Sequence, residues 1–154
     1  MRAPERSELS VRQETAILAG VILPGDDHGG EDPLAELERL AQTAGARVVD
    51  CILQKRTAIE SKTYLGPGKA EELRILCERH DADAILCDHD LSPVQIQSLE
   101  ELTQTKVVDR SELILDIFAT RAKTRQATVQ VELAQMEYTC PRLTRIWSHL
   151  DRHG

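Results

Sequence analysis

The sequence predicts an α/β fold: a small parallel sheet of about four strands with helices on both faces, followed by an all-helical subdomain that ends in a long heptad-patterned helix. Short runs rich in Ile, Leu and Val alternate with helical segments along residues 15–108. That alternation is typical of a parallel sheet made by right-handed crossovers. After residue 110 only helical patterns remain. We therefore expect a flexible tail at 1–13, an α/β subdomain at 14–109 and a helical subdomain at 110–154.

The first strand should cover 15–23, where a continuous apolar run meets a Pro-Gly pair. Asp32 and Pro33 predict the start of a helix, with the aspartate as N-cap and the proline at the first helical position. Gly45 should close this helix, because glycine tolerates the left-handed backbone found just past a helix C-terminus. A second strand should follow at 46–53.

The polar, basic segment at 54–64 is long for a connection within a compact domain, so we expect it to be mobile or functional. It leads through Gly66-Pro67-Gly68 into a helix that should end near His80. The buried face of this helix should carry Ala70, Leu73, Leu76 and Cys77.

Two short strands should complete the sheet, at 84–87 and 106–108. Between them, a serine N-cap followed by a proline predicts a helix over 92–104. The next helix should begin at Asp109 or Ser111 and is apolar through Phe118.

The last segment, 126–152, carries apolar residues at alternating steps of four and three, the spacing of the two core positions of a heptad. A helix with this pattern has one narrow apolar stripe that another helix must cover. Ordinary core packing would explain the stripe, and so would self-association, which we predict. Pro141 should bend the helix without ending it. The stripe consists of Val129, Leu133, Met136, Cys140, Leu143, Trp147 and Leu150.

Composition indicates a cytoplasmic globular protein, with 41% hydrophobic, 29% charged and only 3% aromatic residues. The longest apolar run, 16–23, is far too short to cross a bilayer, and the amino terminus lacks the form of a signal peptide. Four cysteines (Cys51, Cys77, Cys87 and Cys140) lie in apolar patterns without metal-ligand spacing, so we expect buried free thiols and no metal.

The net charge of −7 is unevenly distributed. Residues 1–109 hold 12 Lys and Arg against 21 Asp and Glu, whereas residues 110–154 hold 7 against 5, so the helical end is net positive by 2. An acidic body argues against nonspecific coating of nucleic acid, and a mildly basic end allows a local contact with phosphate. We expect neither DNA nor a membrane as a partner.

The basic residues of the helical end are the best candidates for contacts with RNA phosphates. Some of them share a helix face at spacings of three and four, although arginines at such spacing also occur on ordinary solvated surfaces. The candidates are Arg121, Lys123, Arg125, Arg142, Arg145 and His149.

Gly66, Gly68 and Lys69 are weak candidates for nucleotide binding. A P-loop requires Gly, four residues, then Gly-Lys-Ser/Thr, and this spacing is absent here. A helix N-terminus with a lysine can still hold an anion, but a turn that simply caps a helix explains the same residues.

Asp88, His89 and Asp90 follow the third strand, at the sheet edge where parallel sheets place ligands. Two carboxylates beside a histidine could act as acid and base or hold a metal. No nucleophile or third ligand accompanies them, so a solvated loop is the alternative, and we assign no catalytic residue.

Several long motifs, taken together and in order, resemble the amino-terminal region of HflX-type GTPases. The resemblance covers most of residues 15–152. The motifs are Tyr64-Leu65-Gly66-Pro67-Gly68-Lys69-Ala70-Glu71-Glu72-Leu73, Asp90-Leu91-Ser92-Pro93-Val94-Gln95, Val108-Asp109-Arg110, Leu113-Ile114-Leu115-Asp116-Ile117-Phe118-Ala119, Val131-Glu132-Leu133-Ala134-Gln135-Met136 and Pro141-Arg142-Leu143-Thr144-Arg145.

The resemblance implies a module that binds the large ribosomal subunit and its RNA, in a protein that splits or rescues stalled ribosomes. The family's GTPase domain, with its GTP and Mg²⁺, and the helix that would pair with the apolar stripe should lie beyond residue 154. We therefore expect this chain to be non-catalytic alone and to hold no cofactor. Two alternatives remain: an ATP-binding α/β domain using Gly66, Gly68, Lys69 and Asp88, or a module that dimerises through its terminal helix.

Overall fold

The computed structural model describes residues 10–121 and 125–139. Its centre is a four-stranded parallel sheet in the order β2-β1-β3-β4, which confirms the predicted fold class. The strands match the apolar runs of the sequence, and the last two have the predicted bounds. They are β1 (Thr15–Ile22), β2 (Arg47–Lys55), β3 (Ala84–Cys87) and β4 (Lys106–Val108).

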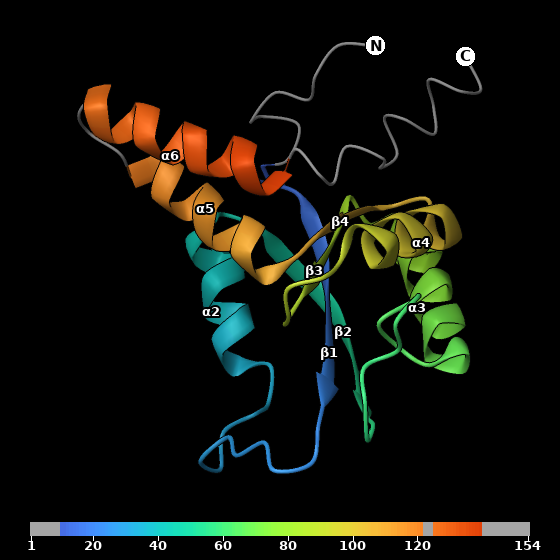
Figure 1. Cartoon of the computed structure of the whole chain (residues 1–154). Helices are drawn as coiled ribbons and strands as arrows, with labels where there is room; N and C mark the ends of the chain where they lie inside the picture. The colour runs from blue at the N-terminus through green and yellow to red at the C-terminus, as the bar shows by residue number, and fades with distance from the viewer. Residues whose placement is uncertain (1–9, 122–124, 140–154) are drawn as a thin grey trace.

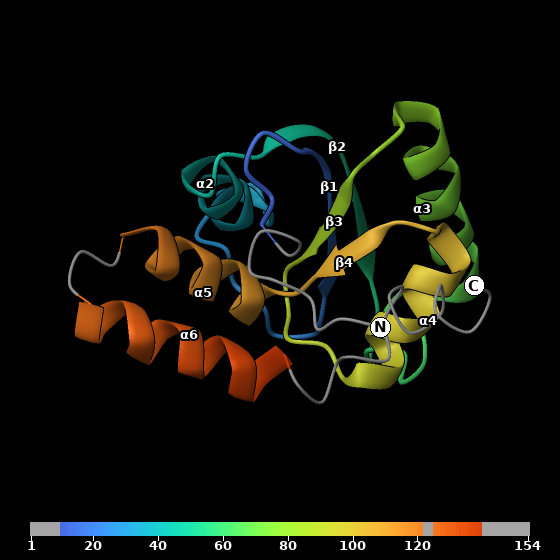
Figure 2. The same cartoon turned by 90° about the horizontal axis from the view of Figure 1, so that it is seen from above.

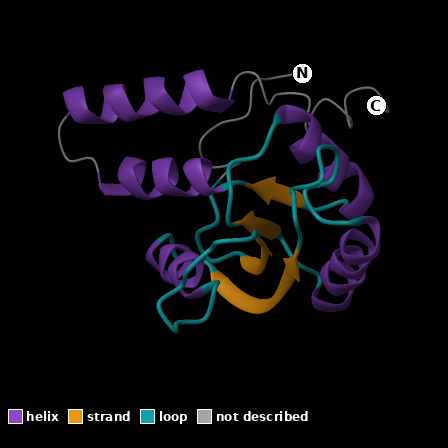
Figure 3. Cartoon of the chain, turned by 60° about the horizontal axis from the view of Figure 1, so that its bottom comes forward, coloured by secondary structure: helices purple, strands orange, loops and turns teal. Residues whose placement is uncertain are grey.

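Helices cover both faces of this sheet (Figures 1 and 3). α2 and α5 lie on one face, and α3 and α4 on the other. With right-handed crossovers, α2 is on the opposite face from α3 and α4 because the chain runs from β1 to β2 in one direction across the sheet and from β2 to β3 and β4 in the other. The helices are α2 (Ala35–Thr43), α3 (Pro67–His80), α4 (Pro93–Thr103), α5 (Arg110–Arg121) and α6 (Arg125–Thr139).

Each face of the sheet has its own apolar core. Alternate residues of a strand point to opposite faces, so Ile17 and Ile85 pack toward α3 and α4, whereas Leu18 and Leu86 pack toward α2 and α5. The second core also contains Leu113, which packs α5 against the sheet.

The start of α2 differs from the prediction. Asp32 is not the N-cap: the helix begins at Ala35, and Leu34 occupies the cap position without a side-chain hydrogen bond. Asp32 Oδ1 instead accepts a hydrogen bond from the Leu34 backbone N–H at 2.8 Å, which forms a local turn before the helix. At the other end, Gly45 has φ +87, so the predicted closing glycine is confirmed.

The segment after β2 is better anchored than its polar sequence suggests. β2 extends to Lys55, and Glu60 and Tyr64 form an isolated antiparallel bridge. Tyr64 and Leu65 are fully buried. The Gln95 side chain fixes the segment further by donating to the Glu60 carbonyl at 2.8 Å.

Cys51 departs from the prediction that all cysteines are buried. Cys77 and Cys87 are buried free thiols, whereas Cys51 lies exposed on edge strand β2. The reason is the sheet order, which leaves one side of β2 without a neighbouring strand. Cys140 lies outside the described residues. Within the described ranges, no helix is long and apolar enough to span a membrane.

Helices α5 and α6 run side by side, with α6 on the outside (Figure 2). The residues of α6 that are partly covered are spaced along one face and include Ala127, Val131, Ala134 and Tyr138. The predicted stripe residues Val129, Leu133 and Met136 point roughly 160° away from that face, given 100° per residue. They are 54%, 54% and 67% exposed.

Candidate functional site

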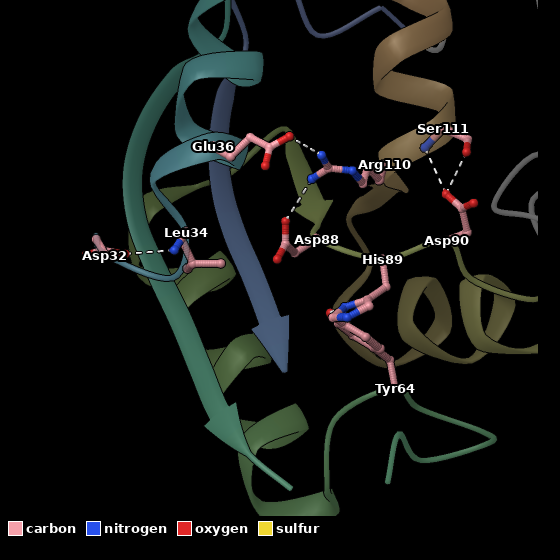
Figure 4. Close-up of polar contacts among 9 residues, drawn as sticks. All are labelled: Asp32, Leu34, Glu36, Tyr64, Asp88, His89, Asp90, Arg110 and Ser111. Atoms are coloured by element: carbon pink, nitrogen blue, oxygen red, sulfur yellow. Dashed lines mark hydrogen bonds and ion pairs between the residues drawn. The ribbon is translucent and has the colours of Figure 1, made fainter. Parts of the chain in front are cut away.

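The loop after β3 lies where the strand order reverses, at the carboxyl ends of β1 and β3. Open parallel sheets place ligands at this crevice because the connecting loops diverge there. Asp88, His89 and Asp90 form the loop, and all three contact the start of α5 (Figure 4).

Each residue of the loop holds α5 through a different group. The Arg110 guanidinium donates to Asp88 Oδ1 at 3.2 Å, and the Arg110 backbone N–H donates to the His89 carbonyl at 3.4 Å. Asp90 Oδ1 accepts from both the backbone N–H and the hydroxyl of Ser111, at 3.0 and 2.6 Å. These residues therefore form a joint between the sheet and the helical pair, rather than a free solvated loop.

Arg110 extends the joint to α2, because its guanidinium also pairs with Glu36. A cavity of about 290 Å³ adjoins this ion pair. Burial raises the pKa of Asp88, and the nearby charges of His89 and Arg110 oppose that rise. The cavity is lined by Asp27, His28, Glu31, Asp32, Pro33, Glu36, Asp88 and Arg110.

The chemistry of this cavity is that of a structural ion-pair site. Carboxylates dominate its walls, and the Arg110 guanidinium is already shared between Asp88 and Glu36. In residues 10–121 and 125–139, no group of three or more His, Cys, Asp or Glu side chains is placed to hold a metal ion. The geometry around Asp88 thus shows side chains engaged in ion pairs and hydrogen bonds that connect α2, the loop after β3 and α5.

Asp109 is the second centre of the joint and is fully buried. Its Oδ1 accepts from the Glu112 backbone N–H at 3.0 Å while its own N–H donates to Glu112 Oε1 at 3.3 Å, the reciprocal pattern of a capping box at the start of α5. Its Oδ2 accepts from the Leu91 N–H at 3.0 Å and from the Tyr138 hydroxyl at 2.5 Å. Burial raises the pKa of Asp109, and these hydrogen bonds oppose the rise.

Tyr64 connects the joint to the segment before α3. Its hydroxyl oxygen lies 2.6 Å from His89 Nδ1, and its backbone has φ +66, a left-handed conformation unusual for a residue with a side chain. Sequence reasoning missed Tyr64, Arg110 and Tyr138, because each acts through a partner far away in the sequence. The Asp-x-x-Glu spacing of 109 and 112 before an apolar run was the one local signal available.

The nucleotide-binding candidates occupy the start of α3. Gly66 is the N-cap, its N–H donates to Gln54 Oε1 at 2.8 Å, and a Cβ at this position would meet the Arg56 and Gln54 side chains. Gly68 is exposed, with nothing within 4 Å of an added Cβ. Lys69 Nζ pairs with Glu72 at 2.9 Å. Packing therefore explains Gly66, and Asp88 is engaged elsewhere, with Arg110.

Two of the candidate RNA-contact residues are described. Arg121 is the last residue of α5 and Arg125 the first residue of α6, and both are exposed. Lys123, Arg142, Arg145 and His149 lie outside the described residues, as do Cys140, Leu143, Trp147 and Leu150 of the apolar stripe.

Comparison with protein families gives two consecutive matches. Residues 31–119 match the family described as GTP-binding GTPase N-terminal, and residues 121–154 match the GTP-binding GTPase Middle Region. The first match alone covers more than half of the chain. The fold and the joint described above therefore belong to the amino-terminal part of a GTP-binding GTPase.

The chain belongs to the HflX-type GTPase family. It is 47% identical over 150 residues to GTPase HflX of Lacrimispora saccharolytica, covering 97% of this chain and 35% of that protein. It is also 42% identical over 139 residues to GTPase HflX of Escherichia coli, covering 90% of this chain and 32% of that protein. The chain thus spans about a third of the length of these relatives.

A solved structure supports the fold independently. The GTP-binding protein from Sulfolobus solfataricus, in complex with GDP, aligns with a TM-score of 0.63 at 21% sequence identity. The alignment covers 86% of this chain and 39% of that protein. At this identity the likeness concerns the arrangement of helices and strands alone.

Proposed function

We propose that this chain is a ribosome-binding module of an HflX-like GTPase, non-catalytic by itself, whose basic helical end contacts RNA of the large ribosomal subunit. The observation that carries the proposal is the placement of Arg121 and Arg125. Both are exposed, at the last residue of α5 and the first residue of α6, which is the end of the helical pair far from the joint. Membership of a GTPase family supports a role within a longer protein, and splitting or rescue of stalled ribosomes is the activity we propose for that protein.

Contacts between arginine and phosphate make binding depend on salt, because each contact releases counterions from the RNA. Sedimentation of the 154-residue chain with purified large ribosomal subunits at 50, 100 and 200 mM salt tests the proposal. We expect the chain to pellet with the subunits at low salt and progressively less as salt increases. No co-sedimentation at 50 mM salt would contradict the proposal.

Self-association through α6 is a second candidate function, favoured by the exposure of Val129, Leu133 and Met136. Covering such side chains is worth up to about 1.5–3 kcal/mol each when burial is complete. Sedimentation equilibrium should therefore show a mass that increases with concentration, and Leu133→Glu should abolish that increase.

Val94→Glu is the matched control for self-association, because Val94 is 57% exposed but lies on α4, on the other face of the sheet. It should leave association unchanged. A wild-type chain that stays monomeric at all concentrations, or a Leu133→Glu chain that associates like the wild type, would rule out this candidate.

A further inference from the structure

Within residues 10–121 and 125–139, helix α6 packs mainly against α5, along one of its faces. No residue of α6 between 125 and 139 is buried. By contrast, α5 buries Glu112, Leu113, Asp116 and Ile117. Since buried apolar area supplies most of the free energy that holds a helix in place, α5 is part of the folded body and α6 is a more weakly held addition to it.

The contact between α5 and α6 is open to solvent near the C-terminal end of α6. A surface groove of about 440 Å³ lies there, between the start of α5 and the end of α6. Side chains that line an open groove remain partly in contact with water, so they bury less apolar area than residues of a closed core. Apolar packing therefore fixes this end of α6 less firmly than the cores fix α5. The lining residues are Ser111, Ile114, Leu115, Ala134, Glu137 and Tyr138.

A polar contact reaches from this end of α6 into the body. The Tyr138 hydroxyl donates to Asp109 Oδ2 at 2.5 Å, and Asp109 is fully buried. Hydrogen bonds to an ionised carboxylate are shorter and stronger than those between neutral groups. Asp109 also accepts from the backbone N–H groups of Leu91 and Glu112, which stay in place whether or not Tyr138 is present.

We propose that the Tyr138–Asp109 hydrogen bond is a reversible contact that holds α6 against α5. When this hydrogen bond breaks, α6 separates from α5 while the sheet and α5 remain folded. The two backbone donors keep Asp109 hydrogen-bonded in the open state, so the cap of α5 survives. Opening uncovers Ile114, Leu115 and Ala134 in addition to the face of α6 that is already exposed.

Hydrogen–deuterium exchange of the 154-residue chain, measured by mass spectrometry, tests whether the Tyr138–Asp109 hydrogen bond holds α6 in place. Tyr138→Phe removes only the hydroxyl, and Tyr64→Phe makes the same change at the chain's second tyrosine, whose hydroxyl contacts His89 inside the body. We expect Tyr138→Phe to accelerate exchange in residues 129–139 by about tenfold or more and to leave β3 and α3 unchanged. Tyr64→Phe should not accelerate exchange in α6 selectively.

Three results would overturn the proposal. The first is unchanged exchange in α6 of Tyr138→Phe, and the second is acceleration that extends equally to β3. The third is a Tyr138→Phe chain that does not fold, because the hydroxyl would then support the body itself. Ribosome binding is not involved in this experiment, so its outcome is independent of the proposed function.

Discussion

Asp109 shows how a single side chain can hold several elements together. One carboxylate receives hydrogen bonds from the loop after β3, from the first turn of α5 and from α6. A buried carboxylate is costly unless such donors compensate for lost hydration. Burial raises the pKa of the Asp109 carboxyl group, and the hydrogen-bond donors around its two oxygens lower it.

Replacing Asp109 by Asn should destabilise the fold by about 1–3 kcal/mol. The carboxylate accepts from a backbone N–H on each oxygen, so an amide group must turn its own NH₂ toward the N–H of either Glu112 or Leu91. Urea unfolding followed by circular dichroism measures the change. Asp90→Asn is the matched control, because Asp90 is exposed and its Oδ1 alone accepts from Ser111. An equal loss in both variants would contradict this account.

Alanine substitutions at Gly66 and Gly68 test whether packing requires a glycine at each of these positions at the start of α3. Gly66→Ala should cost about 1 kcal/mol, because the added methyl group displaces the Arg56 and Gln54 side chains. Gly68→Ala has open space and should be neutral or stabilising by up to about 1 kcal/mol, since it reduces the freedom of the unfolded chain. Thermal unfolding of the two variants is the measurement. A more stable Gly66→Ala chain would show that the predicted crowding does not exist.

At the scale of elements, the sequence predicts the sheet and its helices well where the signals are local. The strands at 84–87 and 106–108 have the predicted bounds, and Ser92 is confirmed as the N-cap of α4, with a complete capping box. Short apolar runs and capping residues act within a few positions of the chain, so one sequence is enough to identify them.

Features that depend on distant partners could not be predicted in this way. The exposure of Cys51 follows from the position of β2 at the sheet edge, and the burial of Tyr64 follows from its contact with the loop after β3. The heptad spacing correctly predicts a helix in the described part of the last segment. However, α6 places a different set of residues, including Ala134 and Tyr138, against α5.

The pairing of β2 with α3 includes a hydrogen bond to a carboxylate that makes stability depend on pH. His80 Nε2 lies 2.9 Å from Asp50 Oδ2, and this hydrogen bond, with that of the Cys51 backbone N–H, lowers the pKa of Asp50. A carboxyl with a lowered pKa in the folded state stabilises the fold above its ordinary value of 3.8 and loses that contribution as pH falls through the lowered value.

We therefore expect Asp50→Asn to be less stable than the wild type at pH 6, with the difference constant down to about pH 5 and closing below pH 4. Urea unfolding at pH 6, 5, 4 and 3 measures it. In a His80→Leu background the same substitution should show much less pH dependence. If the difference in unfolding free energy between the wild type and Asp50→Asn increased as pH falls, the proposed role of Asp50 would be contradicted.

At the scale of the whole molecule, charge and attachment divide the chain at different places. The acidic part before Arg110 contains the sheet, and the joint at Asp88 and Asp109 fixes α5 to it. The net positive part begins at Arg110, but α5 belongs to the folded body, whereas α6 has no buried residue between 125 and 139 and presents Val129, Leu133 and Met136 to solvent. The charge difference supports the proposal that the body positions α5 and α6 and that these helices meet the partner.

The most direct test compares large-subunit binding by two double variants of equal charge. Arg121→Gln/Arg125→Gln alters the last residue of α5 and the first residue of α6, whereas Arg39→Gln/Arg79→Gln alters exposed arginines of α2 and α3. We predict that the first pair weakens binding about tenfold and reduces the salt slope by about 2, one for each lost phosphate contact. The second pair should bind like the wild type. Equal weakening by the two pairs, or none by the first, would contradict the proposed role of the helical end.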